Sequence, residues 1–526
     1  MTSFDCPYRR REFHCAALLS VAGALSALGS LTACTALVDR GRTFGRTSSA
    51  AGDAGPFLDG GNPNRAAVDG RGRGQPAYEQ IAFLKCDTPE RLGVFGYPVL
   101  LSGEDVLVGS AGASISRFAH AGKGYLIEPT GGSWRNITGV GSPHPEGDGG
   151  VPDVLLPTLA IRPPGISMAI SGDTLVLGVA GENVEQNGAS LEDAGAAYVF
   201  ERQAGIFQVV QRLTSSSPRA RATFGLVVAL DGDTLAVGAP WDDGPNAADG
   251  TPSVVDSGAV YVFRRTGALF ESPTVVRPAV FGAGDLFGGA LALQGNLLVV
   301  GDAGEAGTGS GSSADPRARG PQNGGAVYTF VRNGASDAWT QDQYLKPVGA
   351  STAQFFGASV ALNGRTLVVG APTVGRLGSV HTYDRTSGSF VPSGPVLSPP
   401  GVTNGAELFG FSVAVSSDVL VVGTPGDLGT ARGVAGDPAV VDPSVAASGA
   451  AHVYFRRGQT WEHAAYLKAS NADSADLFGL SVAATDSLVL VGAPGESSSG
   501  PLASPEPDDN GTVWAGAAYL FRRSGP

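Results

Sequence analysis

The stretch FGLVVALDGDTLAVGAPWDDGPNAADGTPSVVDSGAVYVFRR, residues 224–265, decides the fold. Residues 224–230 form an apolar run that ends at Asp231-Gly232, a pair typical of a two-residue hairpin turn with positive φ. A second apolar run, 234–239, stops at Pro240, because proline cannot donate a hydrogen bond to a strand ladder. After a polar loop, residues 259–263 are β-branched and aromatic. The stretch therefore predicts three antiparallel strands, at 224–230, 234–239 and 259–263.

The same pattern occurs seven times, at a spacing of about 64 residues. Six copies open with a Phe-Gly pair, whose phenylalanines are Phe95, Phe224, Phe287, Phe356, Phe409 and Phe478. The remaining copy, the second, has Pro164-Gly165 instead. The third strand carries one polar-tipped ring in a fixed column, namely Tyr125, Tyr198, Tyr261, Tyr328, His381, His452 and Tyr519. Self-similarity at such a period indicates a repeat architecture.

A fourth strand follows in most copies, where an aromatic residue precedes an aliphatic residue by six positions. The pairs are Trp134/Val140, Phe207/Leu213, Phe270/Val276, Trp339/Leu345 and Trp461/Leu467. Four antiparallel strands per copy are typical of propeller blades. The sequence therefore predicts an all-β chain that folds as a seven-bladed β-propeller.

The two ends of the repeat region complement each other. Residues 77–85, AYEQIAFLK, resemble the fourth strands WTQDQYLK (339–346) and WEHAAYLK (461–468). The seventh copy, by contrast, has no fourth strand of its own after Phe521. We therefore expect the N-terminal strand to complete the last blade, which would remove two unpaired sheet edges.

These motifs, FG followed by GDTLVVGAP-like and GAVYVF-like segments, resemble the FG-GAP repeats of integrin-α-type β-propellers and their bacterial relatives. The resemblance covers about residues 77–526 and is specific for the fold, whereas a fold alone hosts many activities. It implies extracellular recognition of a protein or glycan ligand.

The N-terminus predicts export. Residues 1–33 combine Arg9-Arg10-Arg11 with an apolar run from 16 to 33, and Leu31-Thr32-Ala33-Cys34 resembles a lipobox, so we expect Cys34 to be lipidated. A transmembrane anchor is the alternative interpretation, although the run is rich in Ala and Gly and barely long enough. Residues 10–13 also resemble a twin-arginine motif, which leaves the export route open. We expect a membrane-anchored lipoprotein at the outer membrane or cell surface.

A low-complexity segment separates this signal from the propeller. Residues 34–76 are rich in Gly, Arg and Pro and lack periodicity, which predicts a disordered tether. After cleavage before Cys34 and lipidation, Cys86 is the sole remaining thiol. We expect it to be a packing or surface residue rather than a nucleophile, with no disulfide in the mature protein.

The long loops after the second strands carry mostly negative charge. Their acids are Glu182, Glu185, Glu192, Asp193, Asp242, Asp243, Asp249, Asp256, Glu305, Asp315, Asp427, Asp437, Asp442, Glu496, Glu506, Asp508 and Asp509, against Arg317, Arg319 and Arg432. The whole chain has a formal net charge of −13. Such a face disfavours nucleic acid as a partner and predicts either a solvated acidic surface or one that collects cations.

Calcium is the cation to consider, because related repeats often bind it between their first and second strands. Here that turn is only two residues long, as at 231–232, so the family's site cannot be carried over. Weak alternative candidates on the long loops are Asp242, Asp243, Asp508, Asp509 and Asn510. We predict no cofactor and no specific response to calcium.

No catalytic motif stands out in the sequence. His381 and His452 fall in the tyrosine column, and the phenylalanines of the Phe-Gly pairs are interpreted as packing residues. We therefore predict a non-catalytic binding or adhesion module that uses the long loops of one face. Two alternatives stay open: a polysaccharide lyase or hydrolase built from carboxylates gathered on that face, and an envelope scaffold protein.

Overall fold

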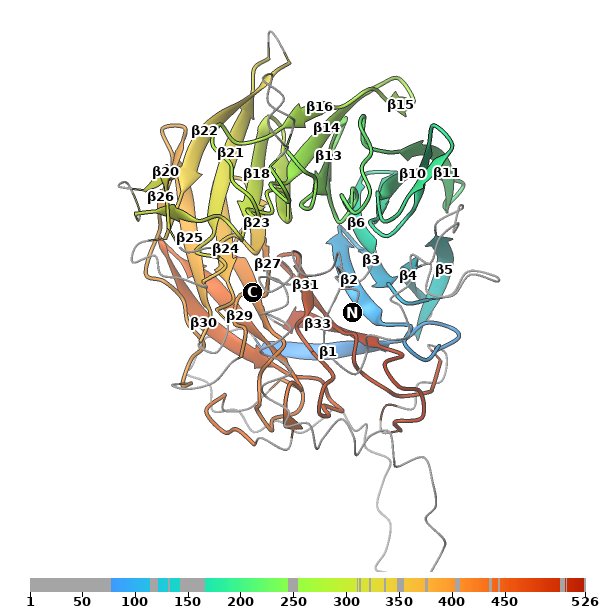
Figure 1. The fold of residues 1–526 in the computed structure, drawn as a ribbon. Helices are drawn as coiled ribbons and strands as arrows, with labels where there is room; N and C mark the ends of the chain where they lie inside the picture. Colours follow the sequence, from blue (N-terminus) through green and yellow to red (C-terminus); the bar gives the residue numbers. More distant parts are fainter. Residues whose placement is uncertain are drawn as a thin grey trace, which may run out of the picture.

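Seven antiparallel sheets are arranged in a ring in the computed structural model (Figure 1). The structure describes residues 77–113, 122–130, 133–141, 166–244, 254–309, 311, 314–320, 323–334, 337–347, 354–373, 377–402, 407–434, 438–442, 445–501, 507 and 509–524. The predicted seven-bladed β-propeller is confirmed. The Pro164-Gly165 pair of the second copy, the signal segment and the tether lie outside the described residues. Within those ranges no helix is long and apolar enough to cross a membrane.

Blades 1 to 3 follow one another along the chain. Blade 1 contains β2 (Phe95–Ser102), β3 (Asp105–Ser110), β4 (Lys123–Thr130) and β5 (Ser133–Gly141). Blade 2 contains β6 (Ile166–Ser171), β7 (Thr174–Val179), β10 (Ala196–Gln203) and β11 (Ile206–Leu213), with a hairpin of β8 (Val184–Gln186) and β9 (Ala189–Leu191) in its long loop. Blade 3 contains β12 (Val227–Asp231), β13 (Thr234–Ala239), β14 (Ala259–Thr266), β15 (Leu269–Phe270) and β16 (Thr274–Val276).

Blades 4 to 7 complete the ring. Blade 4 contains β17 (Ala290–Gln294), β18 (Leu297–Asp302), β21 (Ala326–Arg332) and β22 (Trp339–Leu345), with β19 (Gly307–Thr308) and β20 (Asp315–Arg319) in its loop. Blade 5 contains β23 (Ser359–Asn363), β24 (Thr366–Ala371), β25 (Ser379–Thr386) and β26 (Ser389–Pro392). Blade 6 contains β27 (Ser412–Val415), β28 (Val419–Thr424), β29 (Ala450–Arg457) and β30 (Thr460–Leu467). Blade 7 contains β31 (Ser481–Ala484), β32 (Leu488–Ala493), β33 (Ala517–Ser524) and β1 (Ala77–Leu84).

The ring closes through β1, as the sequence predicts. This strand pairs antiparallel with β33, with Tyr78 opposite Arg523 and Leu84 opposite Ala518. Figure 1 shows the blue β1 beside the red β33. Blade 7 therefore combines the first strand of the described chain with the last, and β33 is not left as an edge.

Two local expectations were wrong. The first strand of blade 3 begins at Val227 rather than at Phe224, because the Phe-Gly pair forms a turn in which Gly225 has a φ of 91°. The outer strand of the same blade is divided into β15 and β16, and Pro273 lies in the interruption between them. Proline lacks the N–H that a continuous ladder needs.

The repeat motifs meet at the junctions between blades. The backbone of Phe287, which opens blade 4, forms a parallel bridge with Gly258 of blade 3. Gly258 has a φ of 82°, and a Cβ at this position would collide with the Phe287 backbone. The Phe287 ring is fully buried and packs edge-on against Tyr328, with centroids 5.7 Å apart. The motif glycines are therefore required by close backbone contact between neighbouring blades.

The phenylalanines of all six Phe-Gly pairs are placed alike. Each is 0% exposed, and each ring packs edge-on against the third-strand column of its own blade. In blades 5 and 6 the partner is His381 or His452 instead of tyrosine. Burial lowers the pKa of both histidines, so the two imidazoles are neutral.

The face that carries the short turns between first and second strands is called the plain face, with turns such as residues 232–233 and 417–418. Arginines at the ends of third strands reach across it to the preceding blade. Arg523 of blade 7 binds Asp418 of blade 6 at 3.1 Å and lies over the Phe455 ring at 4.2 Å. Arg456 likewise binds Asp384 of blade 5 at 2.6 Å. These contacts link successive blades around the ring.

Candidate functional site

The opposite face carries the loops after the second strands and is called the loop face. Five of these loops are long: residues 180–195, 240–258, 303–325, 425–449 and 494–516. Each contains an acid four positions after the glycine of its second strand, and these five acids are called the loop-base acids: Glu182, Asp242, Glu305, Asp427 and Glu496. None is more than 5% exposed. Burying an ionised carboxylate is costly unless a cation or a hydrogen-bond donor offsets the loss of water.

A basic residue at the end of the outer strand supplies that partner in all five blades. The nitrogen–oxygen distances are 2.6 Å for Arg212–Glu182, 2.6 Å for Arg277–Asp242, 2.6 Å for Lys346–Glu305, 2.9 Å for Lys468–Asp427 and 2.7 Å for Lys85–Glu496. The three lysines are at most 1% exposed. Each ion pair therefore joins the start of a long loop to the outer strand of the same blade.

Tyrosines on the third or outer strands complete the pairs. Tyr198 and Tyr261 donate to Glu182 and Asp242, each at 2.7 Å. In blade 4 Tyr344 donates to Glu305 at 3.2 Å, and in blade 6 Tyr466 donates to Asp427 at 2.7 Å. These phenols stay protonated donors, because burial raises the pKa of Tyr261, Tyr344 and Tyr466 well above the usual value.

In blade 7 the side-chain amide of an asparagine stands between the tyrosine and the loop-base acid. Asn471 donates to Glu496 at 3.0 Å and accepts a hydrogen bond from Tyr519 at 2.5 Å. The basic partner in this blade, Lys85, comes from the strand that closes the ring. The loop base of blade 7 and the ring closure therefore share one ion pair.

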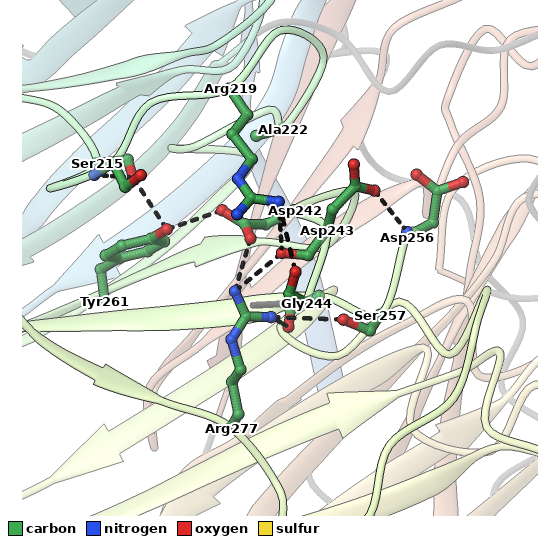
Figure 2. A network of polar contacts seen from close by, with 12 residues as sticks. Ser215, Arg219, Ala222, Asp242, Asp243, Gly244, Asp256, Ser257, Tyr261 and Arg277 are labelled. Atoms are coloured by element: carbon green, nitrogen blue, oxygen red, sulfur yellow. Dashed lines mark hydrogen bonds and ion pairs between the residues drawn. The ribbon is translucent and has the colours of Figure 1, made fainter. Parts of the chain in front are cut away.

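Figure 2 shows the arrangement in blade 3, where two arginines hold the loop base. Arg277 binds the Asp242 carboxylate and also donates to the backbone carbonyl oxygens of Asp243 (3.3 Å) and Gly258. Arg219 donates to the carbonyl oxygens of Asp243 and Gly244, both at 3.4 Å. The loop backbone is thus held by charged donors as well as by its own turns.

Among the described residues, the ion pair of the loop-base acid occurs in the blades whose loop after the second strand is long. Blade 5 has only residues 372–378 between its second and third strands, and its outer region continues into Leu397 and Ser398 without a basic residue. In blade 1 the loop-base position is the buried Ala113. Among the described residues, only blades with long loops therefore carry the buried pair.

The predicted metal candidates lie in different settings. Both carboxylate oxygens of Asp242 are engaged, by Arg277 and by Tyr261, so a cation there would have to displace a guanidinium. Asp243 accepts from the backbone N–H of Asp256 at 3.0 Å. Asp509 accepts from the backbone N–H groups of Ser499 and Gly511, each at 2.9 Å.

The remaining two candidates are at the loop of blade 7. Asn510 donates to Asp473 at 3.1 Å, and Asp508 lies outside the described residues. Across the described ranges, no three His, Cys, Asp or Glu side chains are grouped so that they could hold a metal ion.

The predicted acidic face includes five acids that are neither solvated nor free to collect cations, namely the loop-base acids. The prediction counted cations only within the loops, whereas the partners of the loop-base acids come from the outer strands. The missed residues are Lys85, Arg212, Arg277, Lys346 and Lys468. A signal was available, because a basic residue directly follows the aliphatic end of the outer strand at 84–85, 276–277, 345–346 and 467–468. Exposed acids such as Glu185 and Asp315 remain on the loop face.

Cys86 follows the ring-closing strand and is buried, with 4% exposure. Burial raises the pKa of its thiol to about 11, so little thiolate forms at neutral pH.

Comparison with known proteins identifies the repeat. A model of the FG-GAP repeat family matches residues 207–263, 339–383 and 461–521. Each match runs from the outer strand of one blade to the third strand of the next, so the sequence unit is offset by one strand from the structural blade. No curated protein matches the sequence. Among solved structures, the chain described as "Crystal structure of RRP9 WD40 repeats" is similar, with 9% identity, 86% of this chain and 99% of that chain covered, and a TM-score of 0.45.

Proposed function

This chain is an FG-GAP-repeat β-propeller, and from that premise we propose that it is a non-catalytic binding module whose loop face recognises an extracellular protein or glycan. The observation that carries the proposal is the set of five ion pairs that hold buried acids beneath the long loops. A loop whose base is already fixed loses less conformational entropy when it binds a ligand. Function on rigid scaffolds is concentrated in such loops.

The position of β1 places the attachment point of the N-terminal segment on the plain face. Ala77 pairs with Ser524 at the plain-face end of blade 7, whereas Leu84 and Lys85 lie at the loop-face end. A chain that arrives from residue 76 therefore enters at the plain face. If Cys34 is lipidated and residues 34–76 are a tether, the anchor is attached at the plain face, which leaves the loop face unobstructed for external ligands.

The burial of the loop-base acids supports a binding role over the lyase or hydrolase alternative. A general acid or base must reach its substrate within hydrogen-bond distance. Glu305, Asp427 and Glu496 are at most 1% exposed and ion-paired, so substrate would have to displace a lysine first.

A binding screen with two matched variants tests the proposal. The protein is applied to arrays of glycans and of extracellular proteins. Any ligand found is measured against Glu185→Ala/Asp315→Ala on the loop face and Glu104→Ala/Glu271→Ala on the plain face; all four residues are exposed. We expect weaker binding only for the loop-face variant. Equal effects of both variants, or turnover of the glycan, would contradict the proposal.

A further inference from the structure

Glu407 of blade 6 is a buried carboxylate that the loop-base network leaves out. It precedes Leu408-Phe409 and is 1% exposed. Its backbone carbonyl oxygen accepts a hydrogen bond from the backbone N–H of Gly426 at 3.1 Å. That bond places it against the segment 424–427, which contains the loop-base acid Asp427. Neither of its carboxylate oxygens has a hydrogen-bond donor among the described residues.

Other oxygens of the same segment are also without donors. They are the hydroxyl oxygen of Thr424 and Oδ2 of Asp427, and both residues are 0% exposed. With the two oxygens of Glu407, four buried oxygens in this part of blade 6 lack a partner in the described chain. Each such atom is costly to bury. A proton on Glu407 would add one donor to the O–H of Thr424, which gives two donors for four oxygens.

When Glu407 is ionised, the charges nearby leave its negative charge unbalanced. Lys468 donates to Asp427 at 2.9 Å and to Ser448 at 2.7 Å, so it neutralises the loop-base acid. Glu407 faces this pair, and burial together with the Asp427 carboxylate raises its pKa to about 8. His452 of the same blade is neutral and adds no positive charge.

Blade 4 shows what the equivalent acid requires. Asp285 also stands two residues before its Phe-Gly pair, and its backbone carbonyl oxygen accepts a hydrogen bond from the backbone N–H of Gly304 in the same way. Both of its carboxylate oxygens bind the guanidinium of Arg319, which comes from β20 in the long loop. Blade 4 thus supplies a cation to Asp285 from its own chain, whereas no described residue does so at Glu407. The neighbouring Asp302 of blade 4 is 0% exposed and, like Glu407, has no donor on either carboxylate oxygen.

We propose that blade 6 binds a small monovalent cation, such as sodium or potassium, through Glu407, Thr424 and Asp427. One positive charge balances the one unpaired carboxylate, and oxygens that lack donors are the ligands that a hard cation prefers. A divalent cation would leave an excess positive charge in a buried site, and calcium requires six to eight oxygen ligands. The site is independent of the ligand proposed for the loop face.

Thermal unfolding of the whole protein in chlorides of sodium, potassium and choline tests this site. At matched ionic strength and near-neutral pH, we expect a saturable rise in Tm of a few degrees with sodium or potassium over choline, because a bound ion stabilises the folded state. Glu407→Gln should abolish this difference in Tm between salts. In choline chloride, the Tm of the variant should be no lower than that of the unchanged protein. Asp285→Asn, the same change at the equivalent position, should lower Tm but keep the cation response.

Three outcomes would overturn the proposal: equal Tm in all three salts, a cation response that persists in Glu407→Gln, or a stability that follows pH but not the cation. The last result would mean that the Glu407 carboxylate is neutralised by a proton and not by a bound cation. Crystals soaked in rubidium or thallium(I) provide a direct check, with anomalous density expected between Glu407 and Thr424. Density elsewhere, or none, would also refute the site.

Discussion

Lys85 and Glu496, 411 residues apart in the sequence, form a buried ion pair with Nζ and Oε2 2.7 Å apart. Lys85 directly follows the strand that closes the ring, and Glu496 is the loop-base acid of the last blade. Both side chains are at most 1% exposed. The contact therefore joins the ring-closing strand to the long loop of blade 7 through the same two charges.

Breaking this pair on one side should be costly. Lys85→Met leaves the Glu496 carboxylate buried without its cation, and we expect a loss of about 3–5 kcal/mol in unfolding free energy. The double variant Lys85→Met/Glu496→Leu should recover part of it, because no charge is then left buried. Denaturant unfolding measures both. Arg264→Ala, which breaks an exposed pair with Asp337, is the control and should cost less than about 1 kcal/mol.

The ring closure can be tested by truncation. A protein that begins at residue 87 lacks β1, so blade 7 would expose β33 as an edge together with apolar surface. We expect it to melt at a much lower temperature and to aggregate, compared with a protein that begins at residue 71. Removing residues 35–70 from the mature protein should change Tm very little. Equal melting of the proteins that begin at 71 and 87 would refute the closure.

The blade junctions should be intolerant of side chains at their glycines. Gly258→Ala places a Cβ against the Phe287 backbone and forces a non-glycine residue to a φ of 82°. We expect a destabilisation of at least about 1–3 kcal/mol from backbone strain, with the collision in addition. Gly334→Ala is the matched control, because a Cβ there meets nothing within 4 Å. Chemical denaturation of both variants should separate them clearly.

Asp476 of blade 7 should make stability depend on pH. Burial raises the pKa of this carboxyl from 3.8 to about 8. Because the folded-state pKa is the higher one, its stabilising contribution is complete below pH 3.8 and is lost as the pH rises to about 8. Asp476→Asn should flatten the decline of unfolding free energy across this window, by up to about 1.4 kcal/mol per pH unit. An unchanged pH profile would contradict this assignment.

Lipidation at Cys34 remains a prediction from the sequence alone. Cys34→Ala removes the only lipobox-like cysteine, so the protein should leave the membrane fraction as a soluble or unprocessed form. Membrane fractionation and the mass of the N-terminal peptide measure this. Unchanged fractionation, with no mass difference at the N-terminus, would refute the lipid anchor.

The sequence alone determined the number of blades, the strand order and the closure of the ring. These follow from local patterns that recur in every copy: the turn at Asp231-Gly232, the alternation of strands, and the resemblance of residues 77–85 to an outer strand. Each pattern spans only a few residues, and its recurrence makes the strand assignment unambiguous because the same packing contacts are formed in every blade.

Only the tertiary structure decided which acids of the loop face are solvated. Asp242 and Asp243 are adjacent in the sequence, yet Asp242 is 2% exposed and bound to Arg277, whereas Asp243 caps a backbone N–H. Charge sign does not reveal this, because the neutralising residue lies on another strand, 35 positions away here and 411 positions away for Glu496. Burial of a carboxylate depends on whether a cation reaches it in space. The same reason explains why Asp285 is paired and Glu407 is not, although both stand two residues before a Phe-Gly pair.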